Sequence, residues 1–426
     1  MDLETIFTMD AASIKFGPGS TAEVGEDMAN FGCKRVMVCT DPRVARLEPV
    51  QITMNALEKA GVDAVLFDKS RTEPTDISMR EAIDFAKDGN FDGFVAVGGG
   101  SSIDTCKMAN LYSTYPSDDL LEYVNAPIGK ATPIPNPLKP LIAIPTTAGT
   151  GSETTGVAVF DLTEQHVKTA VSQKQLRPHL GIVDPENTRT LPPMVAAGAA
   201  LDVICHAIES LTNIRYSKRP KAISSAARPS YQGSNPISDV WARRAVELVS
   251  DNIIRAMSDP NDDEAREAMM LASTFAGIGF GNAGVQLPHA MSYPVSGMVR
   301  DYIPEGYPQD HAIIPHGMAV ILNAPAAFRF GAQANPQLHL EMAKLMGADT
   351  RDAAPEDAGE LLANATIDFM RKVGVPNGLS AIGFSEADLD DLVKGAAAQH
   401  RITKLAPRPF TDDDLRDMFK DAMRYW

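Results

Sequence analysis

Hydrophobic positions follow two different spacings along the chain, and the change between them divides the sequence into two parts. In the first part, short continuous apolar runs alternate with segments whose apolar residues recur every three or four positions. The runs predict strands at 13–16, 35–40, 63–68, 141–147, 157–161 and 181–185. The helical spacing predicts helices at 50–60 and 79–87, and the segment 94–111 passes from a strand through three glycines into a helix. Apolar strands alternating with helices are typical of a doubly wound parallel sheet.

Beyond Leu191-Pro192-Pro193 the strand pattern disappears and amphipathic helices dominate. They are expected at 195–212, 236–257, 262–279, 316–329, 337–346, 355–373, 386–397 and 412–424, with irregular stretches at 214–235 and 281–315. We therefore expect a Rossmann-like α/β domain over residues 1–192 and an all-helical domain over residues 193–426. In open α/β sheets ligands bind at the carboxyl ends of the strands, so the expected active site is the cleft between the domains.

The charge balance limits the classes of partner. The chain has 39 Lys and Arg against 55 Asp and Glu, a formal net charge of −16, which argues against nucleic acid and anionic membrane surfaces. Its four cysteines include no CxxC pair and indicate free thiols in a reducing compartment. The acidic N-terminus has neither signal-peptide nor transit-peptide character, and no apolar run approaches a membrane span. A cytoplasmic enzyme that does not bind membranes is expected.

Two glycine- and hydroxyl-rich loops follow predicted strands. The first is Gly98-Gly99-Gly100-Ser101, where glycines and a helix start let backbone N–H groups approach a phosphate; a tight turn without a ligand is the alternative. The second contains Thr146 and Thr147 and either lines a ribose–phosphate groove or satisfies its own backbone. Asp41 ends another strand, where it either accepts a hydrogen bond from a ribose hydroxyl of NAD or caps a helix.

A metal site is indicated in the helical half. Asp202 and His206 are four residues apart in a helical run, so their side chains share one face. His289 and His316 each follow a proline and could complete a set of one carboxylate and three imidazoles, although His311 could compete with His316. Such a set suits Fe(II) or Zn(II) and leaves coordination room for a substrate oxygen.

The motifs GGGSSID, PTTAGTGSE, D-x-x-x-H-A-I-E and PHGMAV resemble, in this order, those of the iron-containing (group III) alcohol dehydrogenases. The resemblance implies that Asp202, His206, His289 and His316 hold the metal, iron by family precedent with zinc as the alternative. It also implies that Gly98–Ser101, Thr146 and Thr147 contact NAD and that Asp41 reads the ribose. A homodimer is expected.

Further segments resemble the hydroxyacid–oxoacid transhydrogenase branch of that family, among them EPTD, NAPIGK, RPSYQGSNPISD, FAGIGFGNAGV, HAMSYPVSG and ITKLAPRP. This branch implies oxidation of 4-hydroxybutyrate to succinic semialdehyde and reduction of 2-oxoglutarate to 2-hydroxyglutarate through bound NAD. An NAD-dependent alcohol dehydrogenase acting on 4-hydroxybutyrate is the alternative. Both acids require a basic clamp, for which the candidates are Arg228, Arg300, Lys404 and Arg408.

Two departures from the wider family bear on the mechanism. Many relatives have a second histidine four residues after the third ligand, where this chain has Tyr293, a phenol that donates hydrogen bonds but is a poor base at neutral pH. The segment between His289 and His316 is also longer than in simple alcohol dehydrogenases and could shape substrate choice. A lyase related to dehydroquinate synthase is less consistent with the sequence, because its first metal ligand is typically Glu. A binding protein without catalysis is disfavoured by the presence of both motif sets.

Overall fold

The computed structural model describes residues 2–165, 167–225 and 227–426, which form two compact units. One unit is Asp10–Leu191; the other combines the residues up to Met9 with Pro192–Trp426. The N-terminal residues join the second unit through backbone and side-chain hydrogen bonds. Glu4 N donates to Arg219 O at 2.8 Å, and Thr8 N donates to Gln232 Oε1 at 2.9 Å.

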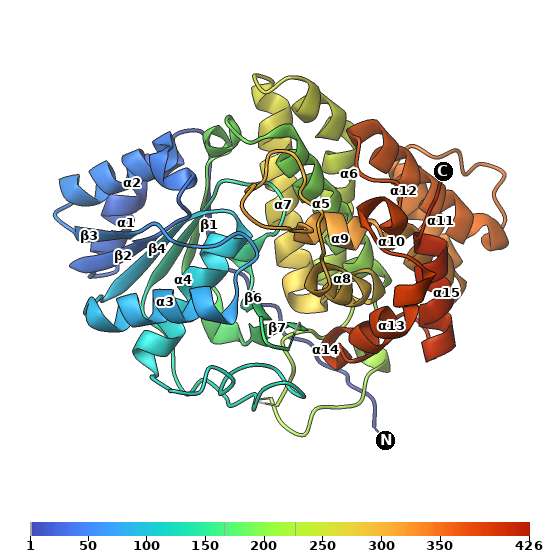
Figure 1. The fold of residues 1–426 in the computed structure, drawn as a ribbon, viewed down its shortest axis with the longest axis horizontal. Coiled ribbons are helices and arrows are strands. Elements are labelled where there is room, and N and C mark those ends of the chain that lie inside the picture. The colour runs from blue at the N-terminus through green and yellow to red at the C-terminus, as the bar shows by residue number, and fades with distance from the viewer. Residues whose placement is uncertain (1, 166, 226) are drawn as a thin grey trace. The chain divides into compact units, whose positions relative to one another are not determined.

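The first unit is built on a six-stranded parallel sheet in the order β1-β8-β5-β4-β2-β3 (Figure 1). Its strands are β1 (Ser13–Phe16), β2 (Arg35–Cys39), β3 (Asp63–Phe67), β4 (Gly93–Gly98), β5 (Leu141–Pro145) and β8 (Leu180–Val183). Its helices are α1 (Val24–Asn30), α2 (Glu48–Lys59), α3 (Asp76–Asp88) and α4 (Gly100–Thr114). The parallel sheet with crossover helices confirms the predicted fold class for this half.

Alternate residues of the central strands enter different cores. Val36 and Val38 of β2 pack with residues of α1 and α2, whereas Met37 and Cys39 pack with residues of α3 and α4. Both faces are therefore covered, with α1 and α2 on one side of the sheet and α3 and α4 on the other (Figure 1). This burial explains why the strands are continuously apolar in the sequence.

The strand expected at 157–161 does not extend the parallel sheet. It is β6 (Val157–Leu162), which pairs antiparallel with β7 (Val167–Ser172), a strand that the sequence pattern did not reveal. β6 instead closes a separate core with α3, α4 and the segment 120–138, to which Phe160 and Leu162 contribute. A two-residue period was hard to recognise in β7 because the buried Lys168 and Thr169 interrupt its apolar positions.

The second unit is helical, which confirms the predicted class of the C-terminal half (Figure 1). Its helices are α5 (Pro193–Thr212), α6 (Pro236–Ser258), α7 (Asp263–Ala283), α8 (Leu287–Gly297), α9 (His316–Ile321), α10 (Ala324–Gly331), α11 (Pro336–Leu345), α12 (Ala358–Val373), α13 (Leu389–Ala397), α14 (His400–Thr403) and α15 (Asp412–Ala422). Helix α5 contacts α6, α7, α9, α11 and α12 and forms the centre of the unit.

Two helix predictions in this half are wrong. The stretch 281–315 was expected to be irregular, but it contains α8, whose two prolines obscure the helical pattern: Pro288 lies in the first turn, where it is tolerated, and Pro294 lies inside the helix. The helix expected over 316–329 is divided into α9 and α10. Asn323 precedes α10 and Pro325 occupies its first turn, so a new helix starts there.

Helix α5 also corrects the expectation about apolar runs. By length and composition this 20-residue helix could cross a bilayer, but 78% of its most apolar window is buried inside the protein. Its apolarity is thus accounted for by its central position in the unit.

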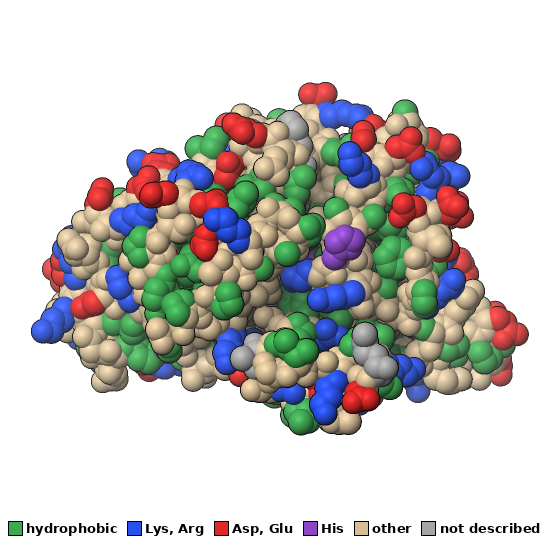
Figure 2. Space-filling view, turned by 90° about the horizontal axis from the view of Figure 1, so that it is seen from below, with side chains coloured by type: hydrophobic (Ala, Val, Ile, Leu, Met, Phe, Trp, Pro, Cys, Tyr) green, Lys and Arg blue, Asp and Glu red, His purple; other side chains and the backbone are tan. Residues whose placement is uncertain are grey.

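On the visible surface, acidic and basic side chains are interspersed (Figure 2).

Candidate functional site

Helix α5 brings the first two candidate ligands together. Asp202 and His206 are buried, and Nε2 of His206 lies 3.8 Å from Oδ1 of Asp202. The imidazole stacks on the ring of Phe280 from α7, with ring centroids 3.9 Å apart and planes inclined by 8°. The helical spacing therefore produces the predicted common face, and the aromatic neighbour fixes the orientation of one imidazole.

The last turn of α5 positions the third candidate. Helices α7 and α8 meet at a bend of 102°, and Gln286 lies at this bend. Its backbone N donates to Oε2 of Glu209 at 2.6 Å, and its side chain donates to Oγ1 of Thr212 at 2.8 Å. These bonds tie the start of α8 to α5, so that His289 in the first turn of α8 faces the pair on α5.

Glu209 also contacts His289 directly. Its Oε1 lies 2.6 Å from Nδ1 of His289, while Nε2 of the same ring lies 3.7 Å from Oδ1 of Asp202. A carboxylate behind an imidazole is the usual support of a metal-binding histidine, because it fixes the tautomer and the ring orientation. Burial, together with the nearby charge of Arg401, lowers the pKa of His289 to about 3, which keeps the ring in its neutral, metal-binding form.

His316 is the first residue of α9 and reaches the site because its neighbour is a glycine. A Cβ on Gly317 would lie 2.3 Å from the carbonyl oxygen of Gly198 and 2.9 Å from Cβ of Asp202. Any side chain there would separate α9 from α5. Glycine thus permits the close approach that puts the imidazole of His316 beside Asp202.

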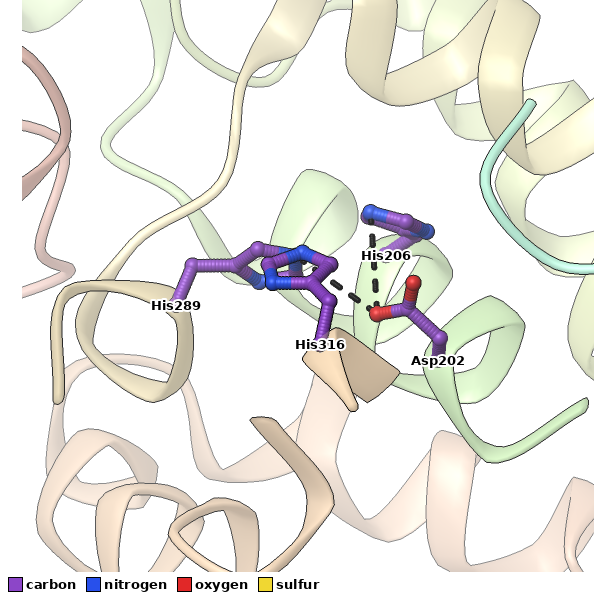
Figure 3. Close-up of side chains that lie close together, drawn as sticks. All are labelled: Asp202, His206, His289 and His316. Atoms are coloured by element: carbon purple, nitrogen blue, oxygen red, sulfur yellow. Dashed lines mark ion pairs between the residues drawn. The ribbon is translucent and has the colours of Figure 1, made fainter. Parts of the chain in front are cut away.

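The four side chains converge from α5, α8 and α9 (Figure 3). One ligand atom from each of Asp202, His206, His289 and His316 can be chosen such that all lie within 4.8 Å of one another. Atoms bound to one ion at about 2.2 Å lie at most about 4.4 Å apart, so closing the site needs small side-chain rotations only.

The donor chemistry fits a divalent transition metal. Three neutral imidazoles and one carboxylate are the ligand types preferred by Fe(II) and Zn(II). Nε2 of His289 is buried, and among the described residues it has no hydrogen-bond partner, which is costly unless an ion binds there. This arrangement supports the metal site without distinguishing between the two ions.

Glu209 was missed by the sequence reasoning, although it is the E of the D-x-x-x-H-A-I-E motif and lies on the same helix face as His206. We predict that Glu209→Gln lowers metal affinity by about 10- to 100-fold, because an amide supports the Nδ1 proton less well than a carboxylate. Competition with a chelator on the metal-loaded protein measures this affinity.

Glu247→Gln is the matched control, since Glu247 forms an exposed ion pair with Arg244 on α6. It is expected to leave metal affinity unchanged. If the wild type and both variants bind the metal with equal affinity, Glu209 does not contribute to the metal site.

Other candidates of this half lie outside the ligand cluster. His311 pairs with Asp310 through Nδ1 at 2.7 Å and is not one of the four converging residues. Cys205, which precedes His206 in the chain, is fully buried, and burial raises the pKa of its thiol, so it is a core cysteine and not one of the four converging residues. Tyr293 is one helical turn beyond His289, and its Oη accepts a hydrogen bond from Arg401 at 3.2 Å.

In the first unit, the predicted nucleotide residues gather at one edge of the sheet. Strand β4 lies between β2 and β5, with Gly98 opposite Pro145 and Ala96 opposite Cys39. The carboxyl ends of these three neighbouring strands are therefore followed by the predicted nucleotide residues: Asp41 after β2, Gly98–Ser101 at the end of β4 and Thr146–Thr147 after β5. This edge is where open α/β sheets bind ligands.

The two loops also pack against each other. A Cβ on Gly100 would lie 2.6 Å from Cγ2 of Thr150, and one on Gly99 would lie 3.3 Å from Cγ2 of Thr147. Thr146 N donates to the carbonyl of Gly98 at 3.0 Å. A side chain at Gly99 or Gly100 would crowd the neighbouring loop. This close packing favours glycine at both positions whether or not a phosphate binds there.

Beneath the loops lies a buried ion pair that the sequence reasoning did not find. Nζ of Lys107 donates to Oγ of Ser152 at 2.7 Å and to the carbonyl of Val157 at 2.8 Å, and it lies 3.4 Å from Oδ1 of Asp104. Asp104 accepts from Oγ of Ser152 at 2.6 Å and from Val159 N at 2.9 Å. Asp104, in the first turns of α4, therefore joins that helix to the second loop.

Asp41 caps the segment that follows β2. Its Oδ1 accepts hydrogen bonds from the backbone N of Arg43 at 2.9 Å and of Val44 at 3.1 Å. Its Oδ2 lies 4.0 Å from the position that a Cβ on Gly98 would occupy. One oxygen thus makes the capping contacts, and the other is directed toward the glycine loop.

Three of the four candidate clamp residues have partners elsewhere. Arg228 pairs with Glu4 at 3.5 Å, Arg300 pairs with Asp388, and Nη1 of Arg408 donates to Gln333 at 2.6 Å. The fourth, Lys404, forms no ion pair with any of the residues that the structure describes.

Comparison with known proteins relates both halves of the chain to one family. The sequence model of the iron-containing alcohol dehydrogenases matches residues 11–185, and that of the Fe-containing alcohol dehydrogenase family, C-terminal part, matches residues 230–423. The hydroxyacid-oxoacid transhydrogenase, mitochondrial, of Bos taurus is 52% identical over 421 residues, covering 99% of this chain and 90% of the relative. That of Homo sapiens is 50% identical with the same coverage.

Solved structures also resemble this chain over nearly its whole length. A crystal structure of 1,3-propanediol oxidoreductase has a TM-score of 0.85 and 27% identity, covering 98% of this chain and 100% of the other. Sulfoacetaldehyde reductase from Bifidobacterium kashiwanohense, solved in complex with NAD+, has a TM-score of 0.78 and 26% identity, with 98% of each chain covered.

The relatives contradict the predicted compartment. The names of the similar transhydrogenases place them in the mitochondrion, so the expectation of a cytoplasmic protein is wrong. That expectation depended on the cysteines, on the character of the N-terminal residues and on the lack of an apolar run long enough to span a membrane. The four cysteines are free and buried, as expected, but free thiols do not distinguish one reducing compartment from another.

Proposed function

The chain belongs to the iron-containing alcohol dehydrogenase family, and from this membership we propose that it is a hydroxyacid–oxoacid transhydrogenase. It is an oxidoreductase that acts on small molecules. In the proposed reaction, 4-hydroxybutyrate is oxidised to succinic semialdehyde and 2-oxoglutarate is reduced to 2-hydroxyglutarate, with NAD carrying the hydride between them. The observation that carries this proposal is the convergence of one carboxylate and three imidazoles in a chain about half identical to transhydrogenases.

The residues of the helical unit would hold the metal. Asp202, His206, His289 and His316 offer oxygen and nitrogen donors, and Glu209 keeps the ring of His289 oriented. When bound, the metal would supply Lewis-acid polarisation of the substrate oxygen, and NAD would supply the hydride acceptor and donor. The chain's own part is to hold both groups in place.

The α/β unit would bind NAD at the carboxyl ends of β2, β4 and β5. The backbone of Gly98–Ser101, at the start of α4, presents N–H groups suited to a pyrophosphate, and Thr146–Thr147 would line the adjoining groove. The structurally similar sulfoacetaldehyde reductase, which was solved with NAD+, supports this choice of cofactor. No proton relay is assigned to Tyr293, because its hydroxyl already accepts from Arg401.

The decisive experiment separates transhydrogenation from ordinary dehydrogenation. Purified, metal-analysed protein is supplied with 4-hydroxybutyrate and 2-oxoglutarate, with and without added NAD, and both products are measured. We expect equal amounts of succinic semialdehyde and 2-hydroxyglutarate without net formation of NADH. Steady NADH formation from added NAD, with no stimulation by 2-oxoglutarate, would identify an NAD-dependent 4-hydroxybutyrate dehydrogenase instead.

Asp41 is expected to set the preference between NAD and NADP. The carboxylate would accept from a ribose hydroxyl and repel a 2′-phosphate. Asp41→Asn keeps an oxygen for the N–H groups of Arg43 and Val44 but removes the charge, so we predict about tenfold tighter NADP binding without loss of stability. Fluorescence titration with both cofactors measures this. An unchanged preference would leave Asp41 with a capping role only.

A further inference from the structure

Beside α8 lies a group of cationic side chains that form no ion pair with a carboxylate of the residues described. Arg401 belongs to α14 and donates from Nη2 to Oη of Tyr293 at 3.2 Å, while its guanidinium lies over the ring of Tyr231 at 4.8 Å. Arg219 donates from Nη1 to the backbone carbonyl of Tyr231 at 2.8 Å. Lys404 directly follows α14.

The charges of this group act on one another, and Arg401 lies close to the candidate metal ligands. Burial and the positive charges of Arg219 and Arg401 lower the pKa of Lys404, although Lys404 keeps an exposed surface. Arg401 donates to Tyr293, which is one helical turn beyond His289 on α8, so its guanidinium lies near that candidate ligand. The cations and the metal candidates are therefore parts of one neighbourhood.

Arg401 in particular is incompletely satisfied. Its Nη1 is buried and has no hydrogen-bond partner among the described residues, and its other contacts are made with two phenols. The nearest acidic group identified for the cluster is Glu4, which acts on Arg219 and already pairs with Arg228. An uncompensated, partly buried guanidinium in a protein of net charge −16 is costly and indicates an anion that binds there.

We infer that Arg401 and Lys404 bind the carboxylate that lies three carbon–carbon bonds from the reacting carbon in both substrates of the proposed transhydrogenation. In 4-hydroxybutyrate the hydroxyl-bearing C4 is three bonds from the C1 carboxylate. In 2-oxoglutarate the keto C2 is three bonds from the C5 carboxylate. This inference rests on the proposed function and assigns its substrate specificity.

The equal spacing explains how one clamp serves both half-reactions. Tyr293, which Arg401 contacts, is one helical turn beyond His289 on α8, so the clamp has a fixed offset from the metal residues. A substrate bound by this carboxylate places its reacting carbon at the same position, whether that carbon is to be oxidised or reduced. The α-carboxylate of 2-oxoglutarate remains available for other contacts.

The test compares a charged with an uncharged alcohol of equal carbon number. NADH formation in a single turnover is followed on metal- and NAD-loaded protein with 4-hydroxybutyrate or butan-1-ol. We expect Arg401→Gln to lower the apparent affinity for 4-hydroxybutyrate by about 10- to 100-fold and to leave that for butan-1-ol unchanged. Lys404→Gln changes an exposed residue. We expect it to lower the apparent affinity for 4-hydroxybutyrate by about tenfold and to leave that for butan-1-ol unchanged. Arg416→Gln, which breaks an exposed pair with Asp390, is the control and should match the wild type.

Calorimetry with succinate, a dicarboxylate that does not react, separates the clamp from the proposed function. If the wild type is inactive with 4-hydroxybutyrate yet binds succinate, and both variants lose that binding, the proposed function fails and the clamp stands. If the wild type is active but either variant keeps full affinity for 4-hydroxybutyrate and succinate, the clamp is overturned. Equal losses for 4-hydroxybutyrate and butan-1-ol, or no succinate binding by the wild type, overturn it as well.

Discussion

Replacing His206 by alanine is expected to remove the metal and to lower the activity by about 10³-fold or more, because the loss of several kcal/mol of Lewis-acid stabilisation acts directly on the barrier. The imidazole is one of four converging donors, and neither His289 nor His316 can take its place, because each is fixed on another helix. Metal content by elemental analysis and product formation in the transhydrogenase assay measure the two effects. Asp202→Ala should behave in the same way.

His339→Ala provides the matched control. His339 is also a buried histidine of the helical unit, but its Nδ1 lies 2.9 Å from the carbonyl of Asn335 and it is not part of the ligand cluster. Both variants lose a buried imidazole and are expected to lose some stability, so the difference in metal content reports on coordination alone. Unchanged metal content in His206→Ala would overturn the ligand assignment.

The second large effect is expected at Lys107. Lys107→Ala removes the cation from a buried pair and leaves the charge of Asp104 uncompensated, which should lower the free energy of unfolding by about 3–5 kcal/mol. Burial already raises the pKa of Asp104 and lowers that of Lys107, so each charge depends on the other. NAD binding should weaken too, because Ser152 connects this pair to the second glycine loop. Urea denaturation and NAD titration measure the two effects.

Two further variants test the charge argument. Asp104→Asn combined with Lys107→Met removes both charges and should recover a large part of the lost stability. Lys59→Ala, at the exposed end of α2, should change the free energy of unfolding by no more than about 0.5 kcal/mol. If Lys107→Ala and Lys59→Ala are equally stable, the buried pair does not support the loops.

Local patterns were sufficient for much of this molecule. The continuous apolar strands, the glycine loops that follow them and the change to helical spacing after residue 191 each depend on the period of a single segment. The pair of Asp202 and His206 could be predicted in the same way, because two residues four positions apart on a helix share a face. Where the pattern was interrupted, as by Pro294 in α8 or by Lys168 in β7, the prediction failed.

What the sequence by itself determined is therefore the class of each half and the residue types of the candidate metal site and the candidate nucleotide site. Tertiary structure alone decided which distant segments meet. It brings α8 and α9 to α5 through the hydrogen bonds of Gln286 and the missing side chain of Gly317. It also shows that Arg228, Arg300 and Arg408 already have partners. In contrast, Nη1 of Arg401 is buried and has no hydrogen-bond partner within the part of the chain that the structure describes. The physical reason is that periodicity is set by covalent geometry within one element, whereas convergence depends on packing between elements that no local pattern encodes.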